Sequence, residues 1–264
     1  FKQKTAYEIM PSLVGSEMCI RDSAINVCIN AAKTGVSSGI FSLEMSREQL
    51  ALRILASAAE VDPLRIRRGL LSLREQERVI TTIGELSDLP VYIDDTPFQG
   101  IVEMRSKARR LSLEQSNGLD MVVIDYLQLI QGEGRGRYGE NRVQEISDIS
   151  RSIKGMARDL NIPVITCSQL SRVVENRPGH RPQLSDLRDS GSIEQDADIV
   201  MFIYREDLYY TEEEWEQHFP GRPYPRGITE LIVSKHRHGQ PGSIKLLFHG
   251  DFIRFESLPR TAES

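Results

Sequence analysis

The chain has 264 residues, of which 39% are hydrophobic and 27% charged, a balance typical of a globular protein with a sizeable core. No apolar run reaches the length of a membrane-spanning helix, so we expect no membrane partner. The formal net charge of −5 argues against a generally basic nucleic-acid-binding surface, although arginines confined to a few loops would still suit DNA. The three cysteines, Cys19, Cys28 and Cys167, have no metal-ligand spacing and predict buried thiols in a reducing cytoplasm.

The first 23 residues do not resemble the start of a domain. They show neither helical nor strand periodicity, and they lack the charged start, apolar centre and cleavage site of a signal peptide. The segment is similar to a translated sequencing adapter joined to a gene fragment. We therefore expect residues 1–23 to be non-native and residues 24–264 to form the domain, with a natural disordered arm as the alternative.

From Ala24 onward, strand and helix patterns alternate. Helices are expected at residues 23–34, 46–60, 72–86, 101–115 and 141–160, the second of them starting with a capping box at Ser46. Strands are expected at residues 39–42, 90–94, 121–130, 163–168, 199–204, 228–234, 243–248 and 252–255, and residues 209–226 form an insertion with a local helix. The pattern predicts an α/β fold with a doubly wound, mostly parallel sheet and a C-terminal antiparallel extension.

The stretch MVVIDYLQLI at residues 121–130 organises this fold. Its apolar run predicts a strand buried on both faces, interrupted by Asp125. A carboxylate there is costly to desolvate unless it is paired or faces a cation, and open α/β sheets bind ligands at the carboxyl ends of their strands. Asp125 is therefore a candidate for holding the water shell of Mg²⁺ beside a nucleoside triphosphate. The alternatives are a helix cap or a pair with a nearby arginine.

Other polar residues also follow predicted strands. Glu44, Asp95 and Gln169 are expected at the same sheet edge as Asp125, because parallel strands all point the same way. Together they suit nucleotide hydrolysis, with one acid for the metal, one base for water and one amide sensing the γ-phosphate. Each has a simpler interpretation: Glu44 would cap the helix near Ser46, and Gln169 would brace the following loop.

Basic residues gather at one strand end and in two loops. Lys235 and Arg237 are two residues apart and so point to the same side, as a finger acting on a neighbouring subunit requires. Spacing alone, however, favours a solvated basic strand end. The loops at residues 131–139 and 171–190 suit tracking of a phosphate backbone or, equally, a solubilising surface. Their arginines are Arg135, Arg137, Arg172, Arg177, Arg181 and Arg188.

Five motifs carry a family resemblance: FSLEMS, VVIDYLQLI, SQLSR, DLRDSGSIEQDAD and SKHRHGQPG. In this order and at these separations, they closely resemble the C-terminal motor domain of bacterial replicative DNA helicases of the DnaB type, over residues 24–256. The resemblance implies a RecA-like ATPase that uses ATP and Mg²⁺ and forms a homohexameric ring around single-stranded DNA. It also implies 5′→3′ unwinding at the replication fork, with a primase and a helicase loader as partners. The rival interpretations are another RecA-like ATPase and a non-catalytic single-stranded-DNA-binding or ring-scaffolding protein.

The resemblance also implies roles for individual residues. Glu44 matches the catalytic glutamate, Asp125 the Walker B acid on Mg²⁺, and Gln169 the sensor of the γ-phosphate. Lys235 and Arg237 match the finger residues that reach the neighbouring subunit's ATP. The residues that fall in the DNA-facing loops of the family are Arg172, Arg188, Asp189 and Gly191.

One motif of the family is missing. A Gly-rich P-loop ending in Gly-Lys-Thr/Ser should precede the helix at residues 23–34, but the sequence there is CIRDS, without lysine or a glycine run. No backbone nest then cradles the β-phosphate, and no lysine neutralises it. We expect the strand before the P-loop, the linker helix and the N-terminal collar to be absent as well. We expect this chain to bind ATP poorly, to hydrolyse essentially none and to assemble weakly. Because Glu44, Asp125 and Gln169 are intact, loss of the P-loop from the record is favoured over its loss from the gene.

Overall fold

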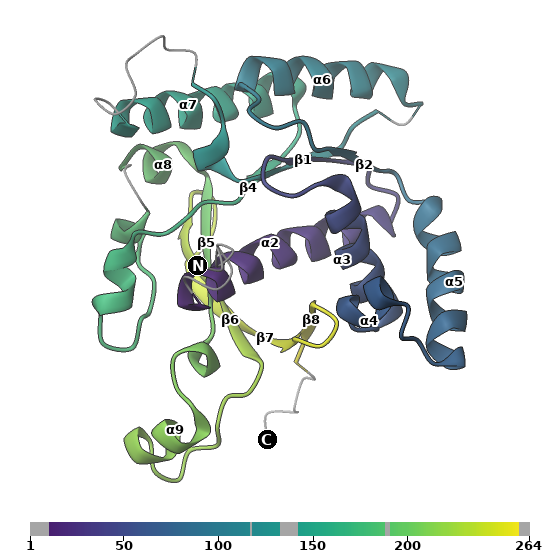
Figure 1. Cartoon of the computed structure of the whole chain (residues 1–264). Coiled ribbons are helices and arrows are strands. Elements are labelled where there is room, and N and C mark those ends of the chain that lie inside the picture. Colours follow the sequence, from purple (N-terminus) through teal and green to yellow (C-terminus); the bar gives the residue numbers. More distant parts are fainter. Residues whose placement is uncertain (1–10, 117, 133–141, 188–190, 259–264) are drawn as a thin grey trace, which may run out of the picture.

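The computed structural model describes residues 11–116, 118–132, 142–187 and 191–258, with side chains described from residue 19 onward. Its frame is a parallel sheet joined to an antiparallel one (Figure 1). The parallel sheet has the order β2-β1-β3-β4, with β1 Ser38–Ser42, β2 Val91–Asp94, β3 Met121–Asp125 and β4 Val164–Thr166. The antiparallel sheet has the order β5-β6-β7-β8, with β5 Ile199–Tyr204, β6 Ile228–His236, β7 Gly242–His249 and β8 Arg254–Ser257.

Helices cover both faces of the parallel sheet. In Figure 1, α6 and α7 lie side by side on one face, and α2 and α3 lie on the other. The helices are α2 Pro11–Ala32, α3 Arg47–Ala59, α4 Pro63–Arg68, α5 Leu73–Ser87, α6 Ile101–Glu114, α7 Arg142–Leu160, α8 Gly191–Asp196 and α9 Glu212–His218. The predicted doubly wound α/β fold with an antiparallel extension is confirmed.

Strand β3 divides the core into two. All five of its residues are buried, and alternate side chains point to opposite faces of the sheet. Val122 and Ile124 pack with residues of α6 and α7, whereas Met121 and Val123 pack with residues of α2 and α3. The expectation of a strand buried on both faces is therefore correct for residues 121–125.

The expectation of one strand over residues 121–130 is wrong beyond Asp125. The chain turns there, and Leu127–Leu129 forms the 3₁₀ turn η1. Leu127 and Ile130 are 1% and 2% exposed and belong to the same core as α7. An apolar run by itself does not tell whether residues are buried by alternation along a strand or by a turn under a helix.

The first described helix crosses the expected boundary between residues 23 and 24. Helix α2 begins at Pro11, and Arg21 and Asp22 are 7% and 3% exposed. Residues 19–23 thus continue the helix that packs under the sheet. The apolar periodicity fails here because buried charged residues, paired with other side chains, occupy positions where apolar residues would be expected. The origin of residues 1–23 and the boundary at residue 24 stay predictions.

Side-chain caps mark the starts of several helices. Ser46 forms the capping box of α3, as its spacing predicts, and Ser72 forms that of α5. Helix α9 lies within the insertion expected at residues 209–226, and Trp215 anchors it at 6% exposure. No helix in the described part of the chain is both long and apolar enough to cross a bilayer.

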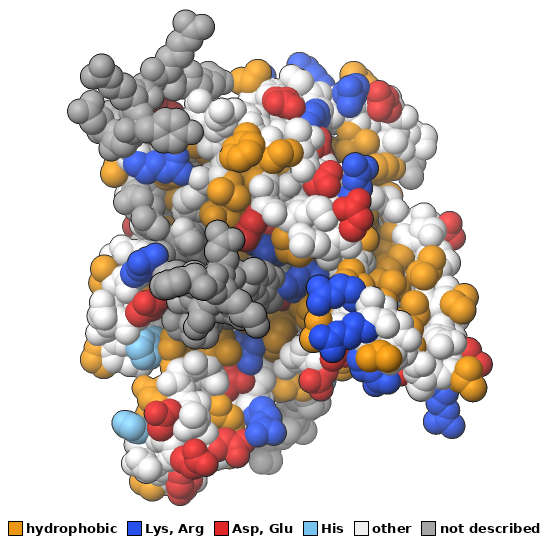
Figure 2. Space-filling model, in the orientation of Figure 1, with side chains coloured by type: hydrophobic (Ala, Val, Ile, Leu, Met, Phe, Trp, Pro, Cys, Tyr) orange, Lys and Arg blue, Asp and Glu red, His pale blue; other side chains and the backbone are white. Residues whose placement is uncertain are grey.

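The surface carries both charge signs and one apolar edge. On the face seen in Figure 2, Lys and Arg side chains alternate with Asp and Glu. Hydrophobic side chains gather at the right of that view, where α5 lies in Figure 1. Leu73, Ile80 and Ile83 of α5 are 78%, 70% and 49% exposed.

Candidate functional site

The carboxyl ends of the parallel strands bring together two of the predicted residues. Ser42 of β1 is in register with Asp125 of β3, and the Leu43 amide donates to the Asp125 carbonyl oxygen at 2.8 Å. Glu44 follows directly. On the other side of β3, the Cys167 amide donates to the Ile124 carbonyl oxygen at 2.9 Å. The strand ends before Glu44, Asp125 and Gln169 are therefore adjacent, as parallel pairing predicts.

Arg21 of α2 joins the two acids. Its Nε donates to Asp125 Oδ2 and its Nη2 donates to Glu44 Oε2, while Nη1 lies 3.1 Å from Met45 Sδ. The Asp125 side chain is 6% exposed and the Glu44 side chain 48%, so the guanidinium spans from the interior to the surface. For Asp125, this is the alternative of pairing with an arginine. Arg21 lies in the segment expected to be non-native, and its positive charge is the one sequence signal that points to a partner for these acids.

Burial and pairing oppose each other in this cluster. Burial raises the pKa of the Asp125 carboxyl above its ordinary value, although the Arg21 guanidinium favours the charged form. Burial by itself would lower the pKa of Arg21, but the Asp125 and Glu44 carboxylates raise it. Next to them, Asp22 accepts from Arg53 Nη1 at 2.8 Å, and burial raises the pKa of Asp22 to about 7.

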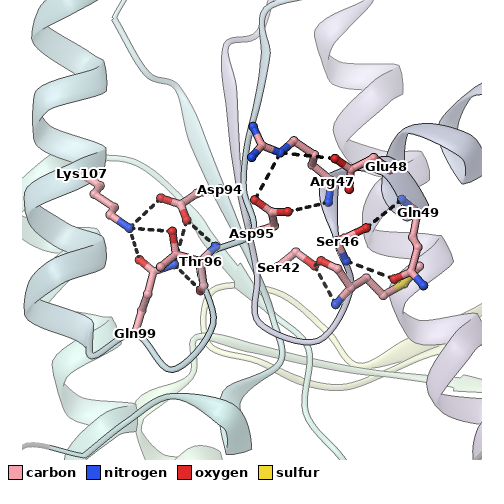
Figure 3. A network of polar contacts seen from close by, with 11 residues as sticks. Ser42, Ser46, Arg47, Glu48, Gln49, Asp94, Asp95, Thr96, Gln99 and Lys107 are labelled. Atoms are coloured by element: carbon pink, nitrogen blue, oxygen red, sulfur yellow. Dashed lines mark hydrogen bonds and ion pairs between the residues drawn. The ribbon is translucent and has the colours of Figure 1, made fainter.

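A set of polar contacts fixes the loop that carries Glu44 (Figure 3). Ser42 Oγ donates to the Met45 carbonyl oxygen at 2.7 Å, which closes the turn around Glu44. The Arg47 amide donates to Asp95 Oδ2 at 2.9 Å. Asp95 therefore holds the start of α3, and the structure does not bring it into the Arg21 cluster.

The end of β2 is fixed by a second group in the same view. Lys107 Nζ donates to Asp94 Oδ2 and to Gln99 Oε1, both at 2.9 Å. The Gln99 side chain is fully buried and donates to Asp94 Oδ1 at 2.9 Å. These contacts attach the loop after β2, which carries Asp95, to α6.

Gln169 is held by a residue that sequence reasoning missed. The backbone amide of Gln169 donates to Gln128 Oε1 at 3.2 Å, and Gln128 Nε2 donates to Ser168 Oγ at 3.0 Å. Gln128 lies in η1, directly after β3. The turn after Asp125 therefore positions the loop after β4.

Lys235 and Arg237 point to the same side, as their spacing predicts, but they contact α8 and the segment that follows it. Lys235 Nζ donates to the carbonyl oxygens of Glu194 and Ala197 at 2.5 and 2.8 Å. Arg237 Nη1 donates to Asp198 Oδ1 at 3.0 Å. Among the contacts described for these two cations, none involves Glu44, Asp125 or Gln169.

The predicted DNA-facing residues fall into two groups. Arg172 is exposed in the 3₁₀ turn η2, Arg172–Asn176, and Gly191 starts α8. Two loop arginines bind internal carboxylates through both terminal nitrogens: Arg177 binds Asp186 at 2.6 and 2.7 Å, and Arg181 binds Glu230 at 2.7 and 2.6 Å. Those two arginines therefore fix the shape of the loop. Arg135, Arg137, Arg188 and Asp189 lie outside the described residues.

The family model of the DnaB-like helicase C-terminal domain matches residues 17–257. This chain belongs to that family. The match begins before residue 24, the expected start of the domain.

The relatives of this DnaB-like domain agree. This chain is 46% identical over 238 residues to the replicative DNA helicase DnaB of Geobacillus stearothermophilus, and the match covers 90% of this chain and 49% of that protein. The identity is also 46% to the replicative DNA helicase DnaC of Bacillus subtilis. The chain therefore spans about half the length of the curated relatives it matches.

Solved structures show the same fold. A DnaB-like replicative helicase, described with its interactions with primase, superposes with a TM-score of 0.82 at 33% identity, covering 92% of this chain and 55% of that one. A second solved structure, described as an ATPase domain, superposes with a TM-score of 0.81 at 33% identity, covering 92% of this chain and 81% of that one. The RecA-like fold class is confirmed by these neighbours.

The DnaB-like domain described here does not fit a metal ion at Asp125. Carboxylate oxygens suit Mg²⁺, but the Arg21 guanidinium already contacts both acids. Within the described residues, no group of three or more His, Cys, Asp or Glu side chains is arranged to hold a metal.

Proposed function

We propose that this chain carries the motor domain of an ATP-driven replicative DNA helicase. Membership of the DnaB-like family carries the proposal, and the adjacent strand ends before Glu44, Asp125 and Gln169 support it. In the intact parent, the domain would use ATP and Mg²⁺ and move 5′→3′ on single-stranded DNA within a homohexamer. Glu44 would act as catalytic base, Asp125 as metal ligand, Gln169 as sensor, and Lys235 with Arg237 as the finger.

Partners of the intact parent follow by analogy. One solved neighbour is described with its interactions with primase, which supports a primase partner for the parent, and a helicase loader is proposed with it. Arg172 and Gly191, with Arg188 and Asp189, would face the DNA. For Lys235 and Arg237, the finger role requires release of their contacts with α8 and Asp198 when a neighbouring subunit binds.

We propose further that the chain as written does not turn over ATP. A phosphate-binding loop offers amides that point at the ligand. Here Cys19–Ser23 lie inside the continuous helix α2, where backbone amides donate within the helix. The Arg21 side chain also binds both acids. Neither the phosphates nor the metal of a nucleotide then has its usual partners.

The test is an ATPase assay on the purified chain with Mg²⁺ and single-stranded DNA. The expected rate equals that of the Glu44→Gln variant, which lacks the proposed base and keeps the loop geometry. A full-length helicase of the same family serves as positive control. Turnover above the Glu44→Gln level contradicts the proposal that this chain is inactive.

The closed acid pair favours a second candidate, a non-catalytic single-stranded-DNA-binding or ring-scaffolding protein. Resequencing the source DNA across the codons for Met18–Asn26 separates the two candidates. A Gly-Lys-Thr/Ser P-loop in that DNA makes the parent a working helicase. Codons for CIRDS in genomic DNA make the scaffold the better interpretation.

A further inference from the structure

Arg21 is the cation nearest to both acids of the candidate site, and its side chain is 8% exposed. Arg53 of α3, the other arginine near this end of α2, binds Asp22 instead. Asp125 is buried, and a buried carboxylate without a partner is strongly unfavourable. Arg21 therefore supplies the positive charge that lets Asp125 and Glu44 lie at neighbouring strand ends.

A guanidinium and a divalent cation exclude each other at this place. The planar fork of Arg21 directs separate nitrogens at the two carboxylates, and each bond is charge-assisted. A metal ion bound to the same two carboxylates would lie against the positive charge of the guanidinium. Arg21 Nη1 also faces Met45 Sδ, so the side chain is enclosed on its third side.

We propose that Arg21 is an internal counter-ion that closes the Glu44–Asp125 pair to divalent cations. The inference rests on the proposed function, because it assigns these acids to the nucleotide site. It adds that a residue of the chain itself, Arg21, closes the site through its side chain. Removing the guanidinium should turn the two acids into a site for a divalent cation.

The experiment measures Mn²⁺ binding to the full chain by the loss of the free-ion electron paramagnetic resonance signal. We expect Arg21→Gln and Arg21→Ala to bind Mn²⁺ more tightly than wild type by at least about tenfold in dissociation constant. Mn²⁺ should also raise the melting temperature of both variants and leave that of wild type unchanged. Adding Asp125→Asn to Arg21→Gln should abolish the gain.

Arg205→Ala is the matched control. Arg205 also binds a buried carboxylate, with Nη2 2.7 Å from Asp207 Oδ2 and side-chain exposures of 12% and 8%. Its loss should lower the melting temperature with no response to Mn²⁺, because a single carboxylate is left rather than two.

Three results would overturn the inference. The first is equal Mn²⁺ affinity in wild type and the Arg21 variants. The second is Mn²⁺ binding by wild type that Asp125→Asn removes. The third is an Arg21 variant that stays unfolded with saturating Mn²⁺, since a cation able to replace the guanidinium would restore folding. Each leaves the ATPase result untouched, so failure of this inference is distinct from failure of the proposed function.

Discussion

Asp22 tests whether residues 19–23 pack on the domain, as the structure shows, or lie outside it, as their sequence suggests. The residue is 3% exposed and accepts from Arg53 Nη1 at 2.8 Å. Burial raises the pKa of Asp22 from 3.8 to about 7 in the folded chain. If the segment lay in solvent, that pKa would stay near its ordinary value.

The sign and size of the effect follow from linkage. Between the unfolded pKa of 3.8 and the folded pKa of about 7, the native state binds more protons than the unfolded state. Stability from this group is therefore greatest below the unfolded pKa and is lost as the pH rises toward 7. With those two values, the free energy of unfolding falls by about 2 to 3 kcal/mol between pH 5 and pH 8.

The assay compares urea unfolding of wild type and Asp22→Asn at these two pH values. The variant lacks the titrating group, so its stability relative to wild type should increase by that amount on going from pH 5 to pH 8. Asp148→Asn, at an exposed position of α7, is the control and should show no such change. A difference between wild type and Asp22→Asn that is the same at both pH values would refute the packing of this segment.

Two further predictions concern the core and the finger candidates. Leu127→Ala should lower the free energy of unfolding by about 3 to 5 kcal/mol in urea titrations, because Leu127 is 1% exposed in the hydrophobic core that α7 covers. A smaller loss would mean that the surrounding side chains collapse into the cavity. Lys235→Met should reduce hydrogen-exchange protection of the backbone from Glu194 to Asp198, since the ammonium binds carbonyl oxygens there; unchanged protection would leave Lys235 as the solvated basic residue that its spacing favours.

Local signals in the sequence predicted much of the fold. The capping box predicted at Ser46 depends on two residues three apart, so a short stretch of sequence contains all of the interaction. The both-face burial of β3 was predictable because a parallel sheet covered by helices requires continuous apolar strands. The order of strands and helices then placed Glu44 and Asp125 at one edge of the sheet.

The features that the sequence could not predict depend mostly on contacts between distant parts of the chain. Arg21 and Asp125 are 104 residues apart, and no local pattern pairs them. For Lys235 and Arg237, spacing gave the shared side of the strand but could not give what that side faces, which is α8 and Asp198. For residues 126–130, burial was predicted correctly but the backbone conformation was not, because a buried turn and a buried strand contain the same types of apolar residue.

The helical backbone of residues 19–23 and the contact of Arg21 with both acids have one structural cause. The face of α2 that packs under the sheet carries Ile25, Cys28 and Ala32, exposed by 5%, 0% and 2%. One helical turn before Ile25 on that face is residue 21, so continuing the helix toward its start delivers Arg21 to the ends of β1 and β3. The same continuation commits the amides of residues 19–23 to the helix. A chain that enters α2 from a loop at residue 23 would free both the amides and the acids, whereas substitution of Arg21 frees only the acids.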